Sequence, residues 1–281
     1  MARAAKQGGY MDSQITGAEA PAKRVLVAGL AAIDVTFAVE SFPHGDAKFQ
    51  APDAQIIGGG GAANASVAIS RLGGHAILAA RVGEDQIADM IVDDLRAEGV
   101  DLDRLQRTPG GRSSFSSVFV DRDGARQILN FRGSGLVEDT GWMRDGPAPD
   151  AVLTDPRWPD GALAVLSLAR ELGVPGVMDG ETPIDLRLLQ VASHVAFSTQ
   201  GLASLNPDPD PARALAALAP EIPGWACVTA GAKGVFYTAA GGDIAHIPAF
   251  PVAVRDTLGA GDVWHGAFTL ELARGSDEEA A

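Results

Sequence analysis

The sequence predicts an α/β protein with a mainly parallel central sheet, helices on both faces of that sheet, and a small β-sheet that forms a lid. Short apolar runs alternate with helical patterns along most of the 281 residues, which is typical of repeated strand–helix units. Two stretches, residues 35–57 and 113–132, break this alternation with strand-like pieces. We therefore assign both stretches to the lid, outside the main layer.

The first part of the chain starts with a continuous apolar run at residues 24–30, the pattern of a strand buried on both faces of a parallel sheet. Four glycines at 58–61 open a small apolar helix over residues 65–72, although a glycine run alone is also typical of a flexible loop. A strand at 75–82 and an amphipathic helix at 86–98 follow. In the second lid stretch, strands at 114–120 and 126–131 flank the turn sequence D-R-D-G, a strong hairpin signal.

The strand–helix alternation resumes after Pro147 and continues to the end of the chain. We predict strands at 151–154, 176–179, 194–198 and 225–229, helices at 161–172, 184–192 and 211–218, a hairpin around Gly241-Gly242, and a last helix from about residue 263. Residues 23–281 therefore form a single domain, and residues 1–22 are a polar, aperiodic leader that we expect to be disordered. Met11 is a candidate start within this leader.

Composition limits the possible partners. The formal net charge of −14 makes nucleic acid an unlikely ligand, but local cations can still bind an anionic substrate. A single cysteine, Cys227, excludes an intrachain disulfide, and its apolar surroundings predict a buried core thiol. No apolar run reaches 18 residues, so we expect no membrane span. The cytoplasm fits these features.

The stretch D-T-L-G-A-G-D at 256–262 is the most informative one. It predicts a tight glycine turn that leads into a helix N-terminus, where unpaired backbone N–H groups bind anions. Asp262 follows at once and is placed as a base beside the anion, which is what phosphoryl transfer to a hydroxyl requires. A glycine turn capped by an aspartate is the alternative. Asp34, just past the first strand, lies where α/β ligand crevices form, unless it is a turn residue.

Three motifs together resemble the ribokinase-like (pfkB) carbohydrate kinases over about residues 23–275: G-G-x-x-x-N at 59–64, T-x-G-x-x-G at 229–234 and the stretch at 256–262. The resemblance implies a three-layer fold and an ATP-dependent sugar kinase with Mg²⁺, and it leaves a monovalent cation open. It makes Asp262 the base and the amides of Gly259, Ala260 and Gly261 the anion hole for the γ-phosphate. The remaining roles are sugar binding by Asp34, Gly59, Gly60 and Asn64, and nucleotide binding by Thr229, Gly231 and Gly234.

The chain departs from the family pattern at two places. The family's N-x-x-E motif, which bears on the water shell of Mg²⁺, is replaced by S-T-Q-G at 198–201, so we name no metal ligand. The chain also ends 19 residues after Asp262, whereas family members continue through helices that help form the adenine pocket. We therefore expect either that the sequence is truncated before the family's C-terminal segment or that nucleotide binding is impaired.

Stretches at 154–161, 178–183 and 195–202 resemble one branch of the family, the bacterial 6-deoxy-6-sulfofructose kinases, which also lack the N-x-x-E carboxylate. That branch binds the substrate's sulfonate through a Lys, an Asn and an Arg, and the matching residues here are Lys48, Asn130 and Arg157. A sulfonate is a permanent anion that needs charge-assisted donors, which Arg and Lys supply. The resemblance implies phosphorylation of the C1 hydroxyl of sulfofructose. Taken singly, these three residues also fit a solvated lysine, a hairpin asparagine and a surface ion pair.

Two rival interpretations remain open. One is a kinase of another ketose or sugar acid, such as fructose, a fructose phosphate or 2-keto-3-deoxygluconate. The other is a catalytically weak sugar- or nucleotide-binding regulatory protein. A lid sheet also exposes edge strands that favour pairing, so we expect a homodimer formed through the lid, with Phe49, Phe115 and Phe119 as candidate contacts.

Overall fold

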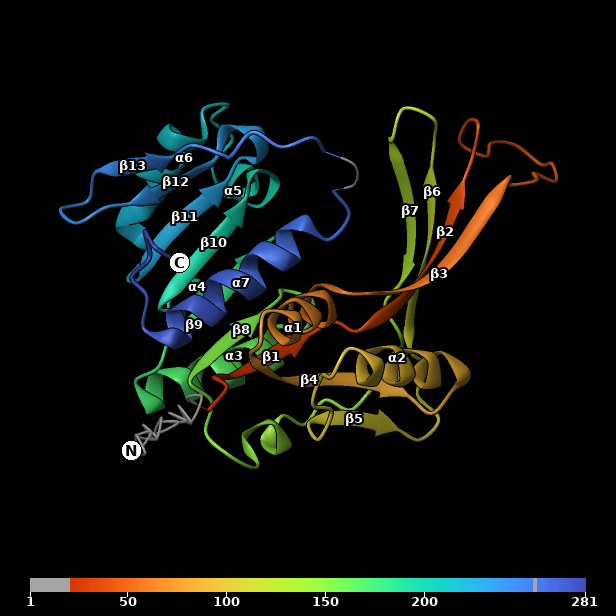
Figure 1. The fold of residues 1–281 in the computed structure, drawn as a ribbon, viewed down its shortest axis with the longest axis horizontal. Helices are drawn as coiled ribbons and strands as arrows, with labels where there is room; N and C mark the ends of the chain where they lie inside the picture. The colour runs from red at the N-terminus through yellow and green to blue at the C-terminus, as the bar shows by residue number, and fades with distance from the viewer. Residues whose placement is uncertain (1–20, 255–256) are drawn as a thin grey trace, which may run out of the picture.

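The computed structural model describes residues 21–254 and 257–281, which fold into a three-layer main body and a separate small sheet (Figure 1). Most of the predicted leader, residues 1–20, and Asp256 of the D-T-L-G-A-G-D stretch lie outside the described residues. Within the described ranges, no helix is long and apolar enough to cross a lipid bilayer.

The main sheet confirms the mainly parallel layer expected from the sequence. Its strand order is β13-β12-β11-β10-β9-β8-β1-β4-β5, and only the pairs β11–β12 and β12–β13 are antiparallel. The strands are β1 Arg24–Gly29, β4 His75–Gly83, β5 Leu105–Thr108, β8 Ala151–Thr154, β9 Gly176–Gly180, β10 His194–Ser198, β11 Trp225–Thr229, β12 Val235–Thr238 and β13 Ile244–Ile247. The parallel strands end at one edge, where α/β proteins form their ligand crevices.

The small sheet has the strand order β3-β2-β6-β7, with β2 and β6 parallel and the other pairs antiparallel. Its strands are β2 Ala32–Ala38, β3 Asp53–Gly59, β6 Ser114–Val120 and β7 Arg126–Phe131. They project away from the main body (Figure 1), so the two predicted lid stretches do pair in one sheet. The hairpin β6–β7 has the bounds expected from its turn sequence.

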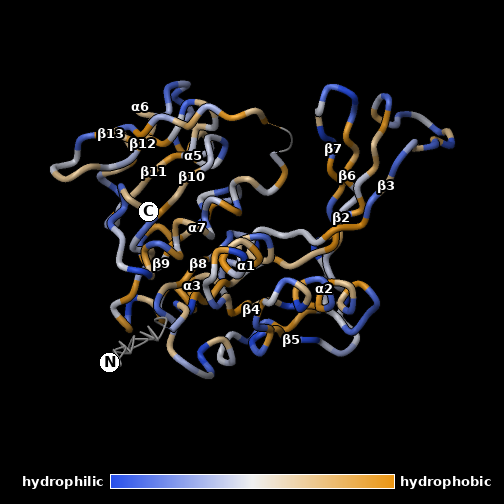
Figure 2. The backbone as a smooth tube through the Cα atoms, viewed as in Figure 1, coloured by the Kyte–Doolittle hydropathy of each residue, from blue (hydrophilic) through white to orange (hydrophobic). Residues whose placement is uncertain are grey.

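Helices cover both faces of the main sheet, because its inner strands are apolar on both sides. Along β1, Val25 and Val27 face α1 and α7, whereas Leu26 and Ala28 face α3. Figure 2 shows the hydrophobic residues gathered along these inner elements. The helices are α1 Gly61–Arg71, α2 Gln86–Ala97, α3 Pro159–Leu172, α4 Leu186–Leu189, α5 Thr199–Leu205, α6 Pro211–Leu218 and α7 Ala260–Arg274, with short 3₁₀ turns at Gly141–Arg144, Ala219–Glu221 and Gly231–Lys233.

The main differences from the sequence prediction are the extents of two helices and two short elements that were not predicted. Helix α1 begins at Gly61, inside the glycine run, and the helix expected over 184–192 is the single turn Leu186–Leu189, which begins after its cap Asp185. Strand β5 and helix α5 were not predicted. Helix α5 is short, and its only start signal is Ser198, whose side chain accepts the Gly201 N–H.

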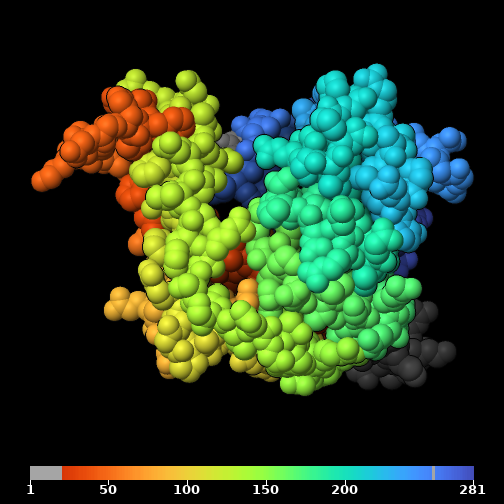
Figure 3. Space-filling view, turned by 180° about the vertical axis from the view of Figure 1, so that it is seen from behind, coloured from red at the N-terminus to blue at the C-terminus, as the bar shows by residue number. Residues whose placement is uncertain are grey.

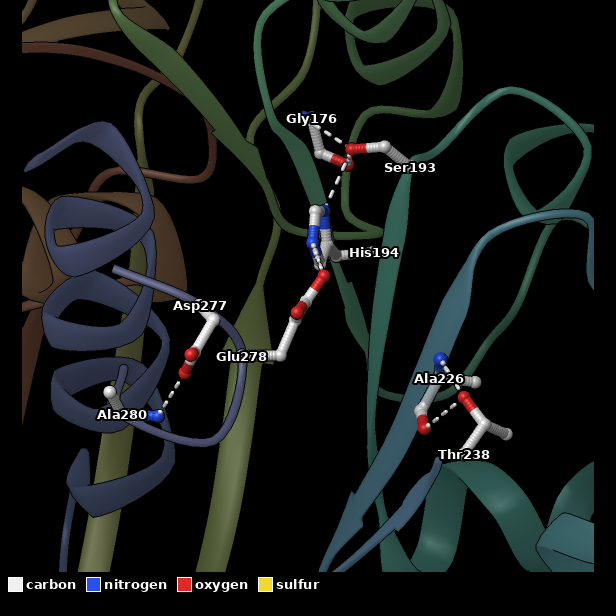
Figure 4. A network of polar contacts seen from close by, with 8 residues as sticks. All are labelled: Gly176, Ser193, His194, Ala226, Thr238, Asp277, Glu278 and Ala280. Atoms are coloured by element: carbon white, nitrogen blue, oxygen red, sulfur yellow. Dashed lines mark hydrogen bonds and ion pairs between the residues drawn. The ribbon is translucent and has the colours of Figure 1, made fainter. Parts of the chain in front are cut away.

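The end of the chain folds back onto the start of β10 and the side of β12 (Figure 4). Glu278 lies 3.3 Å from the buried His194, whose other ring nitrogen contacts Ser193, and Glu279 accepts a hydrogen bond from Tyr237. These contacts anchor the acidic tail at the edge of the sheet opposite the crevice. Burial lowers the pKa of His194, and Glu278 opposes this shift.

Helices α1 and α7 pack side by side (Figure 1), and the site described below depends on their close contact. Gly266 on α7 faces the Ala65 carbonyl on α1, and a Cβ added at Gly266 would lie 2.6 Å from that oxygen. Only glycine permits this approach. The neighbouring Asn64 therefore reaches α7.

We expect Gly266→Ala to lower the free energy of unfolding by about 1–3 kcal/mol, because backbone atoms of α1 must move to admit the methyl group. The reaction rate should fall as well, since α1 carries Asn64. Urea unfolding and steady-state kinetics measure the two effects. Gly141→Ala is the matched control, because its nearest neighbour would lie at an ordinary 3.5 Å. Equal stability of the two variants would contradict the packing argument.

Candidate functional site

A cavity of about 880 Å³ lies at the carboxyl edge of the main sheet, between the main body and the lid. Figure 3 shows this face hollowed between the lid strands and the green and teal part of the chain. Ten of the sequence-predicted site residues line the cavity: Asp34, Gly59, Gly60, Asn64, Asn130, Arg157, Thr229, Gly259, Gly261 and Asp262. Segments far apart in the sequence therefore converge on one place.

The N-terminus of α7 points at this cavity, as the glycine turn predicts. Gly259 caps the helix with a left-handed φ of 70°, and Asp262 lies in the first turn. Around Gly261 a Cβ would meet nothing within 4 Å, so its backbone is open to a ligand. The Ala260 N–H donates to the Thr257 carbonyl at 3.3 Å, so this amide has a partner within the turn. A helix N-terminus of this kind binds an anion.

The carboxylate of Asp262 is held by α1. The Asn64 side-chain amide donates to Asp262 Oδ2 at 2.7 Å, which fixes the orientation of the carboxyl group. Burial raises the pKa of Asp262, and the Asn64 hydrogen bond opposes that rise. A half-buried aspartate with a raised pKa is a stronger proton acceptor than an exposed one.

Asp155, immediately after β8, organises the floor of the cavity. It is 4% exposed and accepts three backbone N–H groups, from Leu30 at 2.7 Å, Ala62 at 3.0 Å and Arg157 at 2.8 Å. These bonds join the end of β1, the first turn of α1 and the loop that carries Arg157. Burial raises the pKa of Asp155, and the three hydrogen bonds oppose the rise.

Three polar side chains form a row across the lid. Asp34 on β2 pairs in register with Ser116 on β6, which pairs with Asn130 on β7. The Asn130 amide donates to Ser116 Oγ at 2.9 Å. Burial raises the pKa of Asp34, and a hydrogen bond from Ser116 lowers it. Because side chains of adjacent strands at the same register share a face, the whole row faces the cavity.

Two arginines add positive charge to the cavity wall. Arg157 follows Asp155 and donates to the Thr182 carbonyl, and Arg132 follows the end of β7. Burial lowers the pKa of Arg132, and repulsion from Arg157 lowers it further, so the two guanidinium groups feel each other's charge. Arg132 was not among the site residues predicted from the sequence. Arg132 lies two residues after Asn130, and this spacing, which places both residues on one face of a strand, could have identified it.

Other predicted residues lie elsewhere. Lys48 is exposed in the segment between β2 and β3 and does not line the cavity. Gly231 and Gly234 have φ values of 55° and 84° in the turn after β11, and they do not line it either. Thr229 does line it and donates to the Phe197 carbonyl at 3.3 Å. The turn after β11 is therefore adjacent to the cavity and only partly inside it.

The residues present fit a nucleotide's phosphates but supply no ready metal cage. Since the Ala260 amide has a partner within the turn and Ala260 does not line the cavity, the amides of Gly259 and Gly261 are those that suit a phosphate group. Among the described residues, no group of three His, Cys, Asp or Glu side chains has the arrangement that holds a metal ion. A Mg²⁺ ion bound to nucleotide phosphates keeps several waters and needs few protein ligands, so we assign it none.

A parallel sheet with a lid, an anion site at a helix N-terminus and a carboxylate beside it define a phosphoryl-transfer enzyme that acts on a small hydroxyl compound. Residues 22–281 match the pfkB family of carbohydrate kinases, and the chain belongs to that family. The expected enzyme class, an ATP-dependent carbohydrate kinase, is thereby confirmed.

Curated relatives cover the chain nearly end to end. The ribokinase of Bacillus subtilis is 25% identical over 92% of this chain and 89% of its own length. The ATP-dependent ribose-1-phosphate kinase of Halopiger xanaduensis is 30% identical over 92% of this chain and 88% of its own. Both relatives phosphorylate sugars according to their names.

Solved structures confirm the ribokinase-like fold. A candidate ribokinase from Agrobacterium tumefaciens has a TM-score of 0.82 and 33% identity, with 92% of this chain and 87% of that one covered. Arabidopsis thaliana ribokinase, solved with ribose and ATP, has a TM-score of 0.79 and 24% identity, with coverages of 92% and 88%.

We expect Asn64→Ala to move the acid limb of kcat/KM to higher pH by about one unit. Asp262 must be ionised to accept a proton, and the Asn64 hydrogen bond stabilises that ionised form, so its loss raises the pKa of Asp262 further. A pH–rate profile from about pH 4 to 9 measures the shift. Asp262→Asn, which should reduce kcat by more than about a hundredfold, is the control. An unchanged acid limb would contradict the role given to Asn64.

Proposed function

We propose that this carbohydrate kinase transfers the γ-phosphoryl group of ATP to the C1 hydroxyl of 6-deoxy-6-sulfofructose. The observation that carries the proposal is the pair of guanidinium groups of Arg132 and Arg157 in the same cavity as Asp262. Asp155 attracts both groups, and an anionic sugar would give them a second, charge-assisted partner within a protein of net charge −14. A sulfonate provides such an anion at the end of the sugar opposite to the reacting hydroxyl.

The chemistry assigned to the cavity is simple. Asp262 Oδ accepts the proton of the C1 hydroxyl group. The hydroxyl oxygen forms the new bond to the γ-phosphorus, and the bond from this phosphorus to the β,γ-bridging oxygen breaks, so that ADP leaves. The open amides at the start of α7 stabilise the charge on the transferred group. Mg²⁺, carried by the nucleotide, neutralises phosphate charge, and a monovalent cation is a further candidate cofactor.

The rest of the cavity positions the sugar. Asp34 and Asn64 offer acceptor and donor groups near the glycines at 59 and 60, and a Cβ at Gly59 would collide with the Asp34 carboxylate. The glycines therefore allow backbone and ligand to approach closely. Asn130 adds a neutral donor beside the arginine pair. Lid closure onto the sugar would exclude water and limit hydrolysis of ATP, and Lys48, on a lid loop, is proposed to join the sulfonate when the lid closes.

A second candidate is a kinase of a phosphate-bearing sugar. The 30% identity with a ribose-1-phosphate kinase favours it, because a phosphate would be bound by the same two arginines. Non-anionic sugars such as ribose or fructose offer no anion to the arginine pair, whose charge is then opposed by Asp155 alone among the groups that act on both. The anion-binding residues therefore distinguish charged from neutral substrates, and kinetics must distinguish sulfonate from phosphate.

We further propose that the lid forms a homodimer. The lid face that points away from the cavity carries Ile56 and Leu129, which are 60% and 73% exposed, and they share one cross-strand row. Phe49 is 52% exposed, whereas Phe115 contacts Phe131 at a tilted angle, Phe119 stacks on Phe37, and both rings are half-buried. The exposed aliphatic pair is therefore a better candidate contact than the two half-buried rings.

We expect kcat/KM to be higher with sulfofructose than with fructose, fructose 6-phosphate, ribose, ribose 1-phosphate or 2-keto-3-deoxygluconate. Arg157→Ala should raise KM for the anionic sugar at least about thirtyfold while changing KM for ATP less than about threefold, because one charge-assisted contact is lost. Arg170→Ala, on an exposed part of α3, is the control. A better phosphate-bearing substrate would replace the sulfosugar by the second candidate, and no turnover of any sugar would favour a regulatory protein.

Light scattering should report a dimer at assay concentration, and Leu129→Lys should shift it toward monomer. The substitution places a charge on an already exposed position, so it should not affect folding. Leu129→Met is the matched control, because it keeps the apolar surface and should leave the dimer intact. A monomeric parent protein would refute the proposal.

A further inference from the structure

Next to Asp262, where the main cavity meets the ends of the strands, lies a group of buried polar residues to which the proposed mechanism gives no chemical role. A small cavity of about 10 Å³ lies there between the ends of β8 and β9 and the helices α1 and α7, and its lining includes Thr154, Asp155, Asp179, Asp262 and His265. All of these residues except Asp262 are at most 8% exposed. The volume is sufficient for about one water molecule, provided that polar groups surround it.

Two polar atoms at this cavity have no partner within the described part of the protein. Thr154 Oγ1 and His265 Nδ1 are fully buried and make no hydrogen bond. The other nitrogen of His265, Nε2, lies 3.2 Å from the Ala196 carbonyl, which can only accept, so Nε2 carries the ring proton. His265 Nδ1 is then an acceptor directed to the interior, and a donor must satisfy it.

The same place concentrates negative charge. The carboxyl groups of Asp155, Asp262 and Glu181 all act on Asp179 from neighbouring segments, and the Arg157 cation opposes them. Several buried carboxyl groups this close cannot all be ionised, so one of them keeps its proton. Asp155 is stabilised as an anion by three backbone N–H groups, and Asp262 by Asn64. Asp179 accepts no hydrogen bond that would stabilise its anion among the contacts found in the structure.

We propose that Asp179 stays protonated in the active enzyme and, with His265 and one bound water, acts as a positioning residue that limits the negative charge beside Asp262 to that of Asp155. Asp179 Oδ1 lies 3.8 Å from His265 Nε2, and both residues line the small cavity with Asp262. The neighbouring charges and burial raise the pKa of Asp179 well above its usual value, in agreement with this assignment. The inference rests on the proposed role of Asp262.

Protonation matters because the reaction brings a highly charged nucleotide to this site. An ionised Asp179 would add a further negative charge to those of Asp155 and Asp262 near the transferred phosphoryl group, which costs transition-state stabilisation. A neutral Asp179 avoids this cost and can donate a hydrogen bond. When the pH rises enough to ionise Asp179, the rate should therefore fall.

The test compares pH–rate profiles of the parent protein with Asp179→Asn, which has the same shape and no charge. We expect kcat of Asp179→Asn at pH 7 to remain within about fivefold of the parent, with the alkaline decline of the profile lost. Asp179→Ala should lose more than about tenfold in kcat, because neither shape nor hydrogen bond remains. A loss of more than about a hundredfold in the Asn variant, or an alkaline limb identical to that of the parent, would overturn the proposal.

His265 provides an independent variant in case the Asp179 variants do not fold, which circular dichroism monitors. His265→Leu should lower kcat with little change in KM for sugar or ATP, and His265→Gln, whose amide can donate to the Ala196 carbonyl, should restore part of it. Equal kcat values for the Leu and Gln variants would overturn the positioning role. All profiles are measured with whichever sugar the parent phosphorylates best, so a wrong sugar assignment does not affect the result. An active Asp262→Asn variant would instead refute the role of Asp262.

Discussion

The architecture of the site depends on one buried carboxylate, Asp155. Its three backbone hydrogen bonds join the end of β1, the start of α1 and the Arg157 loop, so these three walls of the cavity are held in place by one side chain. Gly29 is required for this arrangement, because a Cβ there would lie 2.3 Å from the Asp155 carboxyl group. Removing such a carboxylate leaves several buried N–H groups unpaired, which costs more than the net value of one hydrogen bond.

Burying acidic groups beside an anion site creates an electrostatic conflict that the structure resolves locally. Asp155 and Asp262 receive hydrogen bonds from N–H groups, and two guanidinium groups, of Arg132 and Arg157, face the same cavity. Hydrogen-bond donors that bind anions are thus held in fixed positions. The protein as a whole has a net charge of −14, and its overall field repels anions. Local, partly buried charges are screened less by solvent than the surface field, so they determine what binds.

The sequence predicted the fold closely because its strands are short apolar runs with clear boundaries. The bounds of β6, β7, β8, β10, β11 and α6 agree with the prediction, since turn residues or proline mark both ends. The prediction from the sequence failed for short elements without a clear periodicity, namely β5 and α5. In the site, motif spacing located Asn64 and Asp262, whereas the roles of Asp155 and Arg132 depend on contacts between distant segments, which no local pattern records.

The fold itself places Asn130 and Arg157 in the cavity, but it leaves Lys48 outside. Asn130 is fixed by pairing between strands, and Arg157 by the backbone bonds of Asp155, so both are placed by the fold itself. Lys48 lies on an exposed loop that no such contact holds in the cavity, and its placement would cost loop entropy that a ligand must offset. A lid that orders its loop only on an anionic sugar would couple closure to substrate charge, which gives the kinase selectivity at the step where water is excluded.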